Sequence, residues 1–166
     1  MPRIIMIDDE GDYPDMIQYV TIFRDCGFAV GPEIPQLYDG LSEGGIFTDV
    51  DDFLGYVDYL LTPNDAEAQI ERMEIRAFIV DQKMPPGDRL AGDFPNMQLA
   101  RNPALSGATL IKYLYNLFAS EKTPNSIQWF VLSLFEGRGI EPPFEYLSKE
   151  NGYAINCDTI RRALDS

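Results

Sequence analysis

Three aspartates stand at places where their side chains could share one cation. Asp8 and Asp9 follow the apolar run 4–7, and Asp81 follows the apolar run 77–80. If both runs are strands of one parallel sheet, their carboxyl ends meet at one edge, where ligands bind in open α/β sheets. Three carboxylates held side by side require a compensating cation, and Mg²⁺ is the natural one for oxygen ligands. The sequence therefore predicts a magnesium site built on Asp8, Asp9 and Asp81.

Two further strand ends also carry polar residues. Ser133 ends the β-rich run 127–132, and Lys149 follows the short run 144–147. Taken singly, each strand-end residue has a plain structural interpretation, such as a helix cap, a turn hydroxyl or a surface lysine. Taken together, the ordered set of an acidic pair, an aspartate, a serine and a lysine is more specific than any of its parts.

Length, composition and charge bound the class of protein. The chain has 166 residues, of which 45% are hydrophobic, which predicts a single domain over residues 1–166 with one well-buried α/β core. Its 13 basic and 27 acidic residues give a net charge of −14, which repels phosphate backbones and anionic lipids. Neither nucleic acid nor a membrane surface is therefore expected as a direct partner.

Two residue types narrow the chemistry further. The chain contains no histidine, which excludes imidazole bases, His-containing zinc sites and a phosphohistidine on this chain. Cys26 and Cys157 are far apart in sequence and form no C-x-x-C motif, so we expect two buried free thiols in a reducing compartment. The first residues match neither a signal peptide nor a membrane span, and we expect a cytoplasmic protein.

Strand-like runs alternate with helical patterns along the chain, which predicts an α/β protein with a parallel sheet. The expected strands are 4–7, 28–30, 77–80, 127–132 and 144–147, and helices are expected within 14–27, 49–62, 66–73, 106–123 and 159–164. The stretches 31–45 and 85–106 are rich in turn-forming residues and are interpreted as inserted loops. The tract 135–143 leaves little room for a full helix.

Short motifs around the strand ends carry a family resemblance over nearly the whole chain. They are Ile7-Asp8-Asp9-Glu10, Gly27-Phe28-Ala29-Val30, Val80-Asp81-Gln82-Lys83-Met84-Pro85, Gly107-Ala108-Thr109-Leu110-Ile111, Ser133, and Tyr146-Leu147-Ser148-Lys149. In this order they resemble the receiver domain of two-component response regulators. The resemblance implies a flavodoxin-like fold with a doubly wound five-stranded parallel sheet, here with long inserted loops and a reduced fourth helix.

The same resemblance implies a role in a phosphorelay. Asp81 would accept a phosphoryl group from a phosphohistidine on a sensor histidine kinase or a histidine phosphotransfer protein. Mg²⁺ would be held by Asp9, Asp81 and the carbonyl of Lys83, and by Asp8 through water. The activity would be limited to phosphorylation and dephosphorylation of this one aspartate.

Three other residues would complete the implied mechanism. Lys149 and Ser133 would bind the phosphoryl oxygens, because an anionic acceptor that meets an anionic donor needs positive charge and hydrogen-bond donors there. Signalling would follow when Ser133 moves toward the phosphate and Tyr146 moves into the space behind it. With no output domain in these residues, the readout would be a changed surface recognised by a downstream protein target.

Departures from the family pattern leave two other functions open. Leu134 stands where the family has a small residue, Glu150 follows Lys149 in place of a proline, and the interval from Ser133 to Lys149 is short. These features favour a divergent receiver that binds a partner without phosphorylation. A Mg²⁺-dependent phosphohydrolase also uses a strand-end aspartate as nucleophile, but its Asp-x-Asp motif is absent from both acidic strand ends.

Overall fold

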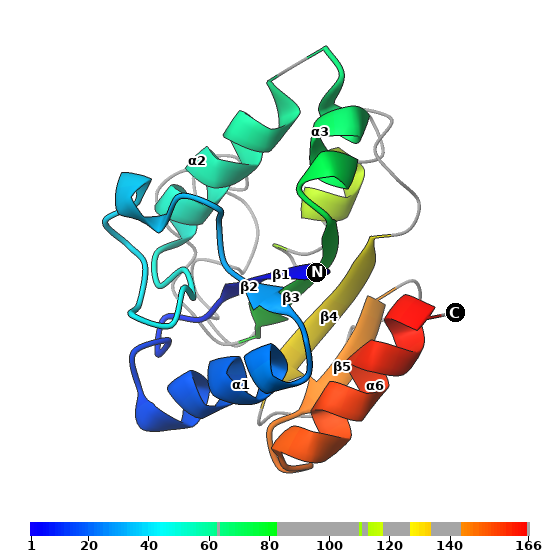
Figure 1. Cartoon of the computed structure of the whole chain (residues 1–166). Coiled ribbons are helices and arrows are strands. Elements are labelled where there is room, and N and C mark those ends of the chain that lie inside the picture. Colours follow the sequence, from blue (N-terminus) through cyan, green and yellow to red (C-terminus); the bar gives the residue numbers. More distant parts are fainter. Residues whose placement is uncertain (63, 83–109, 111–112, 118–126, 134–143, 166) are drawn as a thin grey trace, which may run out of the picture.

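A parallel sheet with helices on both faces forms the centre of the molecule (Figure 1). The computed structural model describes residues 1–62, 64–82, 110, 113–117, 127–133 and 144–165. The elements are β1 (Arg3–Ile7), α1 (Pro14–Asp25), β2 (Ala29–Val30), the 3₁₀ helix η1 (Pro35–Leu37), α2 (Val50–Leu61), α3 (Ala66–Arg72), β3 (Ile75–Asp81), β4 (Gln128–Ser133), β5 (Phe144–Ser148) and α6 (Tyr153–Asp165); residues 110 and 113–117 are also helical.

The strand order is β2-β1-β3-β4-β5, and every neighbouring pair is parallel. This is the doubly wound, flavodoxin-like arrangement, and the predicted fold class is confirmed.

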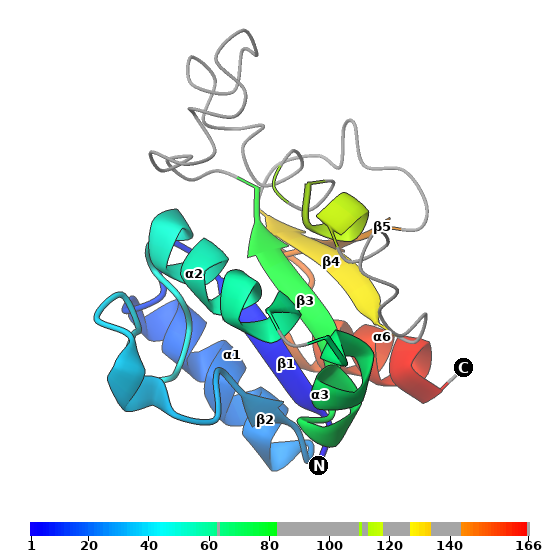
Figure 2. The ribbon, with the colours of Figure 1, turned by 90° about the horizontal axis from the view of Figure 1, so that it is seen from above.

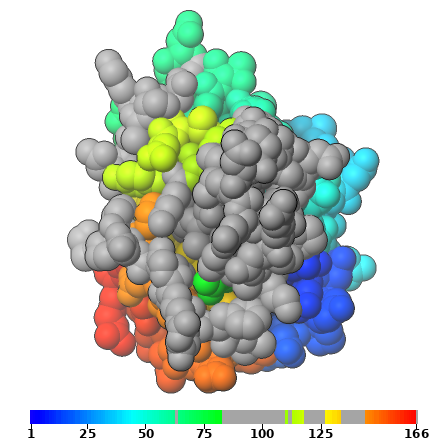
Figure 3. All heavy atoms as spheres, turned by 180° about the vertical axis from the view of Figure 1, so that it is seen from behind, coloured from blue at the N-terminus to red at the C-terminus, as the bar shows by residue number. Residues whose placement is uncertain are grey.

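The strands are apolar without interruption because both faces of the sheet are covered. In β1, Ile4 and Met6 pack into one buried cluster with α1 and α6, whereas Ile5 and Ile7 pack into a second cluster with α2. Figures 1 and 2 show α1 and α6 side by side on one face, with α2 and α3 on the other. The second cluster also contains Trp129 of β4 and Leu114 of the helical residues 113–117. Seen from behind, this helix lies next to β5 (Figure 3), where the rings of Tyr115 and Phe144 are 5.5 Å apart.

The stretch predicted as the first inserted loop leaves the sheet and returns to it. β2 pairs only with the first residues of β1. Further along β1, Phe47 takes the place of β2: its N–H donates to the carbonyl of Met6 at 2.9 Å, and its carbonyl accepts from the Asp8 N–H at 2.9 Å. The two ends of the loop touch at a glycine pair, since a Cβ on Gly31 would lie 2.6 Å from the carbonyl oxygen of Gly45. Residues after the loop therefore complete the edge beside the carboxyl end of β1.

The last helix differs most from its predicted bounds. It begins at Tyr153, not at Thr159. The prediction missed this beginning because the buried side chains there are Asn156, which is polar, and Cys157, which is small. An apolar periodicity therefore misses the first two turns. The expected free cysteines are present: Cys157 is buried as predicted, and Cys26 is half-buried.

Some predictions fall on residues outside the described part of the chain. These are the inserted loop 85–106, Lys83, Leu134, the tract 135–143 with its reduced fourth helix, and the expected helix 106–123 apart from residues 110 and 113–117. Within the described residues, no helix is both long enough and apolar enough to span a bilayer.

Candidate metal centre at the carboxyl edge of the sheet

The three aspartates predicted to share a cation lie together. Asp8 directly follows β1 and Asp81 ends β3, and these two strands are neighbours in the sheet. One carboxylate oxygen from each of Asp8, Asp9 and Asp81 lies within 4.8 Å of the other two. Asp8 and Asp81 are buried, whereas Asp9 is exposed and faces solvent at the rim. The arrangement is an acidic cluster that could bind a metal ion.

Lys149, which directly follows the edge strand β5, completes the cluster. Its Nζ lies 3.0 Å from Oδ2 of Asp8 and 3.4 Å from Oδ1 of Asp81. The side chain is 17% exposed, against 2% for Asp8 and 8% for Asp81. The ammonium is therefore held largely out of water between two buried carboxylates.

The alternation of side chains along the strands explains why these groups meet. Asp8 comes two residues after Met6, Asp81 two after Ile79, and Lys149 two after Leu147. All three preceding apolar residues belong to the cluster under α1 and α6. Because residues i and i+2 of a strand point to the same face, the charged side chains lie on the same side of the sheet. Ser133 comes two residues after Val131, which belongs to the opposite cluster, so the same rule assigns Ser133 to the α2 side.

Burial and mutual repulsion shift the ionisation of the carboxyl groups. Burial, together with the negative charge of Asp8, raises the pKa of Asp81 to about 7, although Lys149 acts in the opposite direction. Although Asp9 is exposed, the surrounding protein shields its carboxyl group from part of the solvent, and this desolvation, with the charges of Asp8 and Glu10, raises its pKa. Burial alone would lower the pKa of Lys149, but the two neighbouring carboxylates outweigh it and raise that pKa. The lysine therefore stays charged while the aspartates resist ionising together.

The charge balance of the cluster fits a divalent cation. Ionisation of all three carboxylates beside the one ammonium would leave two negative charges uncompensated among these residues. A hard divalent cation would supply the missing positive charge. The donor set of carboxylate oxygens suits Mg²⁺ or Ca²⁺ rather than a softer metal.

A tight turn after β1 positions Asp9 and contains Gly11. The Glu10 N–H donates to Oδ1 of Asp8 at 2.8 Å, and the Gly11 N–H donates to the carbonyl of Asp8 at 2.9 Å. A Cβ on Gly11 would lie 2.9 Å from Cγ2 of Ile46 and 3.0 Å from the Asp8 carbonyl oxygen. Glycine at this position lets the turn close against the segment that returns from the inserted loop.

The predicted switch residues are connected to the lysine through one carbonyl group. The backbone oxygen of Ser133 accepts a hydrogen bond from the Lys149 N–H at 2.9 Å and another from the Tyr146 hydroxyl at 3.1 Å. Ser133 is buried and Tyr146 is half-buried. A change in the backbone of Ser133 would therefore be felt by both the lysine and the tyrosine.

Two residues that sequence reasoning missed support the turn that carries Lys149. Asn156 in α6 donates through Nδ2 to the carbonyl of Ser148 at 2.8 Å and to the hydroxyl of Tyr19 in α1 at 3.0 Å. The end of β5 is thus tied to both helices on that face. The sequence contains one signal of this role, a polar residue at a helix position that faces the sheet.

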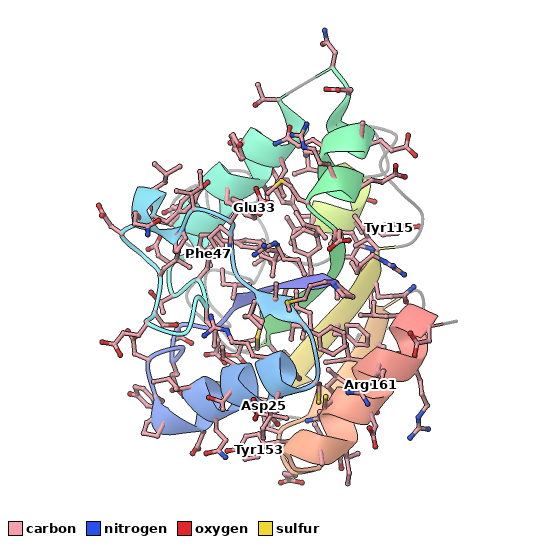
Figure 4. All side chains as sticks on the ribbon, viewed as in Figure 1. Asp25, Glu33, Phe47, Tyr115, Tyr153 and Arg161 are labelled. Carbon is pink, nitrogen blue, oxygen red and sulfur yellow. The ribbon has the colours of Figure 1, made fainter. Side chains whose placement is uncertain are left out.

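A surface hollow of about 260 Å³ opens beside the lysine. It is bounded by the beginnings of α1 and α6, and its lining includes Lys149, Glu150, Tyr13 and Tyr153. Figure 4 labels Tyr153 near the beginning of α6. The hollow provides access from solvent to the side of the charged cluster that Lys149 occupies.

The sheet order and the strand-end residues define this protein as a flavodoxin-like α/β protein with a candidate metal centre at the carboxyl edge of its sheet. Comparison with family models, curated proteins and solved structures finds no match to the chain. The class therefore rests on the fold and on the geometry of the cluster.

Proposed function

We propose that this protein is a receiver-like phosphoacceptor in which Asp81 takes a phosphoryl group from a phosphohistidine. One observation carries the proposal. Asp8, Asp81 and Lys149 lie at the carboxyl ends of three different strands, yet the ammonium lies within 3.4 Å of both carboxylates. A nucleophilic carboxylate beside an acidic partner and a buried lysine is the arrangement that transfer between two anions requires.

The proposed chemistry is a direct displacement at phosphorus. A carboxylate oxygen of Asp81 attacks, the bond from phosphorus to the donor imidazole nitrogen breaks, and the imidazole keeps the electron pair and is protonated. The product on this chain is an acyl phosphate. Lys149, now 3.4 Å from Asp81, moves its ammonium onto a phosphoryl oxygen and holds it there. Asp9, Asp81 and the Lys83 carbonyl, with Asp8 acting through water, would hold Mg²⁺, which would supply positive charge against the remaining charge on the phosphoryl group.

The proposed signal runs through Ser133 and Tyr146. In the described structure both the tyrosine hydroxyl and the Lys149 N–H donate to the Ser133 carbonyl. When the Ser133 hydroxyl turns toward a phosphoryl group on Asp81, this shared carbonyl moves and Tyr146 loses or changes its hydrogen bond. The surface of β4 and β5 is then altered for a downstream protein target. Donor kinases and phosphotransfer proteins of this kind act in the cytoplasm, which is where we place this protein.

The test is phosphorylation by a small phosphodonor in the presence of Mg²⁺. Acetyl phosphate or phosphoramidate should add one phosphoryl group, seen by intact mass spectrometry, and EDTA should prevent the addition. Asp81→Asn should abolish it. Asp25→Asn, which makes the same change at an exposed position at the end of α1, should leave it intact. Absence of labelling at any Mg²⁺ concentration, in a chain that binds Mg²⁺, would overturn the proposal.

The low accessibility of Asp81 favours a second function. Asp81 is 8% exposed and already has an ammonium at 3.4 Å, so a donor must displace an existing ion pair to reach it. We therefore keep as the alternative a receiver-like module that binds its partner without phosphorylation. Under this alternative, Asp81→Asn leaves partner binding unchanged.

A further inference from the structure

Two cysteines that lie far apart in the sequence meet between two helices. Cys26 follows α1 and Cys157 lies in α6, 131 positions later, yet their Sγ atoms are 2.6 Å apart. Both are free thiols. The two side chains are already in contact, so only a small movement separates them from the disulfide bond length of about 2.05 Å.

The surroundings of the pair give the two thiols different roles. Cys26 is half-buried, so a small oxidant can reach it, whereas Cys157 is 1% exposed. Burial and the contact with Cys26 raise the pKa of Cys157 to about 12. Cys157 is therefore a poor first target, and it is well placed to react with an oxidised Cys26.

A side chain of the neighbouring helix α6 holds the backbone at Cys26. Arg161 of α6 donates to the carbonyl of Cys26 at 3.3 Å, and Figure 4 shows this arginine beside sulfur atoms at the junction of α1 and α6. Cys157 packs in the same buried cluster as Phe23 of α1 and Ile160 of α6. Because both helix backbones are fixed by this packing, the thiols remain together in the folded state.

We propose that Cys26 and Cys157 are a modification site at which a hydroperoxide forms an intramolecular disulfide. The sulfur of Cys26 attacks the peroxide, the O–O bond breaks, and an S–O bond forms to give a sulfenic acid; the departing oxygen carries away the thiol proton as an alcohol or water. The sulfur of Cys157 then attacks the sulfur of Cys26, the S–O bond breaks, and water leaves with the second thiol proton. Overall, two thiols are oxidised to one disulfide and one hydroperoxide is reduced, so the step is balanced.

The cross-link would act on the element that carries Lys149. Cys157 follows Asn156, whose amide holds the carbonyl of Ser148 at 2.8 Å. Oxidation therefore locks α6 to the end of α1 one residue away from the contact that positions the turn after β5. This inference does not depend on the proposed phosphoryl transfer, because it uses only the contact between the two cysteines.

The experiment is oxidation of the reduced full chain with an equimolar amount of hydrogen peroxide. Alkylation followed by intact mass spectrometry should show both thiols disappearing together, with the chain still monomeric, and dithiothreitol should restore both. Digestion without reductant should yield one cross-linked peptide pair that contains residues 26 and 157. The oxidised form should unfold at a Tm higher by at least about 5 °C, because a cross-link across so long a segment restricts the unfolded chain.

Two variants provide the controls. Cys26→Ser, a change at the half-buried position, should leave Cys157 fully available to the alkylating reagent after denaturation at the same peroxide dose. Cys157→Ala should leave Cys26 as a sulfenic acid that a dimedone probe captures. If the wild-type chain instead accumulates sulfinic acid on Cys26 with Cys157 still reduced, or forms disulfide-linked dimers, the proposal is wrong. This result in the wild-type chain decides the question even if a variant folds poorly.

Discussion

The Nζ atom of Lys149 lies 3.0 Å from Oδ2 of Asp8, although 141 positions separate the two residues in the chain. The strands that carry them are not neighbours, because β3 and β4 lie between β1 and β5 in the sheet. The long side chain of the lysine spans this distance and also approaches Asp81. The ion pair therefore joins the first and last strands of the chain at the candidate metal centre.

Loss of Lys149 should destabilise the protein in a way that a divalent cation reverses. Lys149→Met leaves buried carboxylates without their positive partner, and removal of one member of a buried pair lowers the free energy of unfolding by about 3–5 kcal/mol. Urea denaturation in EDTA should show this loss, and added Mg²⁺ should recover part of it. Arg162→Met, which removes a positive charge at an exposed position of α6, should change stability by less than about 0.5 kcal/mol. Equal losses in the two variants would contradict the role given to Lys149.

Magnesium should stabilise the folded chain through Asp9. A ligand that binds only the folded state adds about 2.7 kcal/mol of stability at a concentration 100-fold above its Kd. Thermal unfolding at constant ionic strength should therefore give a Tm that rises with Mg²⁺ concentration. Asp9→Asn should greatly reduce the rise, and folding should tolerate this change because Asp9 is exposed. If the Tm of Asp9→Asn rises with Mg²⁺ as much as that of the control variant Asp25→Asn, the cation does not bind at this cluster.

Without a divalent cation, stability should fall as the pH rises through the titration of Asp81. The pKa of this group is about 7 in the folded state and 3.8 as its ordinary value, so between these values the folded state binds more protons than the unfolded state. The stabilisation is complete below about pH 4 and is lost as the pH approaches 7, with a slope of at most about 1.4 kcal/mol per pH unit. The measurement is urea denaturation in EDTA at several pH values. Asp81→Asn should show a smaller decline over the same window; parallel curves for the two proteins would count against this assignment.

Substitution of Gly11 should disturb the turn that presents Asp9. In Gly11→Ala the new Cβ would lie 2.9 Å from the side chain of Ile46 and 3.0 Å from the Asp8 carbonyl, so the turn must open. We expect a loss of about 1–3 kcal/mol in stability and weaker binding of Mg²⁺. Gly55→Ala is the matched control, because Gly55 lies within α2 and its Cβ would meet no atom within 4 Å.

The control variant Gly55→Ala should be more stable than the wild type, not less. Alanine in an open helix position stabilises a protein by about 0.5–1 kcal/mol relative to glycine. Chemical denaturation and isothermal titration with Mg²⁺ on both variants test the pair. If Gly11→Ala matches the wild type in both stability and Mg²⁺ affinity, the turn at this site does not require glycine.

The sheet and the residues at its edge follow from local sequence. Uninterrupted apolar runs such as 77–80 indicate strands buried on both faces, and the residue that ends each run lies at the carboxyl edge of a parallel sheet. The positions of Asp8, Asp81, Ser133 and Lys149 at strand ends were predictable for this reason. A helix whose inner face holds a buried amide and a thiol is not visible to the same reasoning, which is why the beginning of α6 was placed at Thr159 rather than Tyr153.

Strand periodicity is a local property, so the sequence was enough to predict which residues stand at the strand ends and on which face of each strand they lie. The order of the strands, and the contacts between residues far apart in the chain, emerge from the fold as a whole. The contact of Lys149 with Asp8, the return of Phe47 to the edge of β1, and the meeting of Cys26 with Cys157 all join distant parts of the chain. Such contacts depend on strand order and helix packing, which are set by burial of the two apolar clusters as a whole.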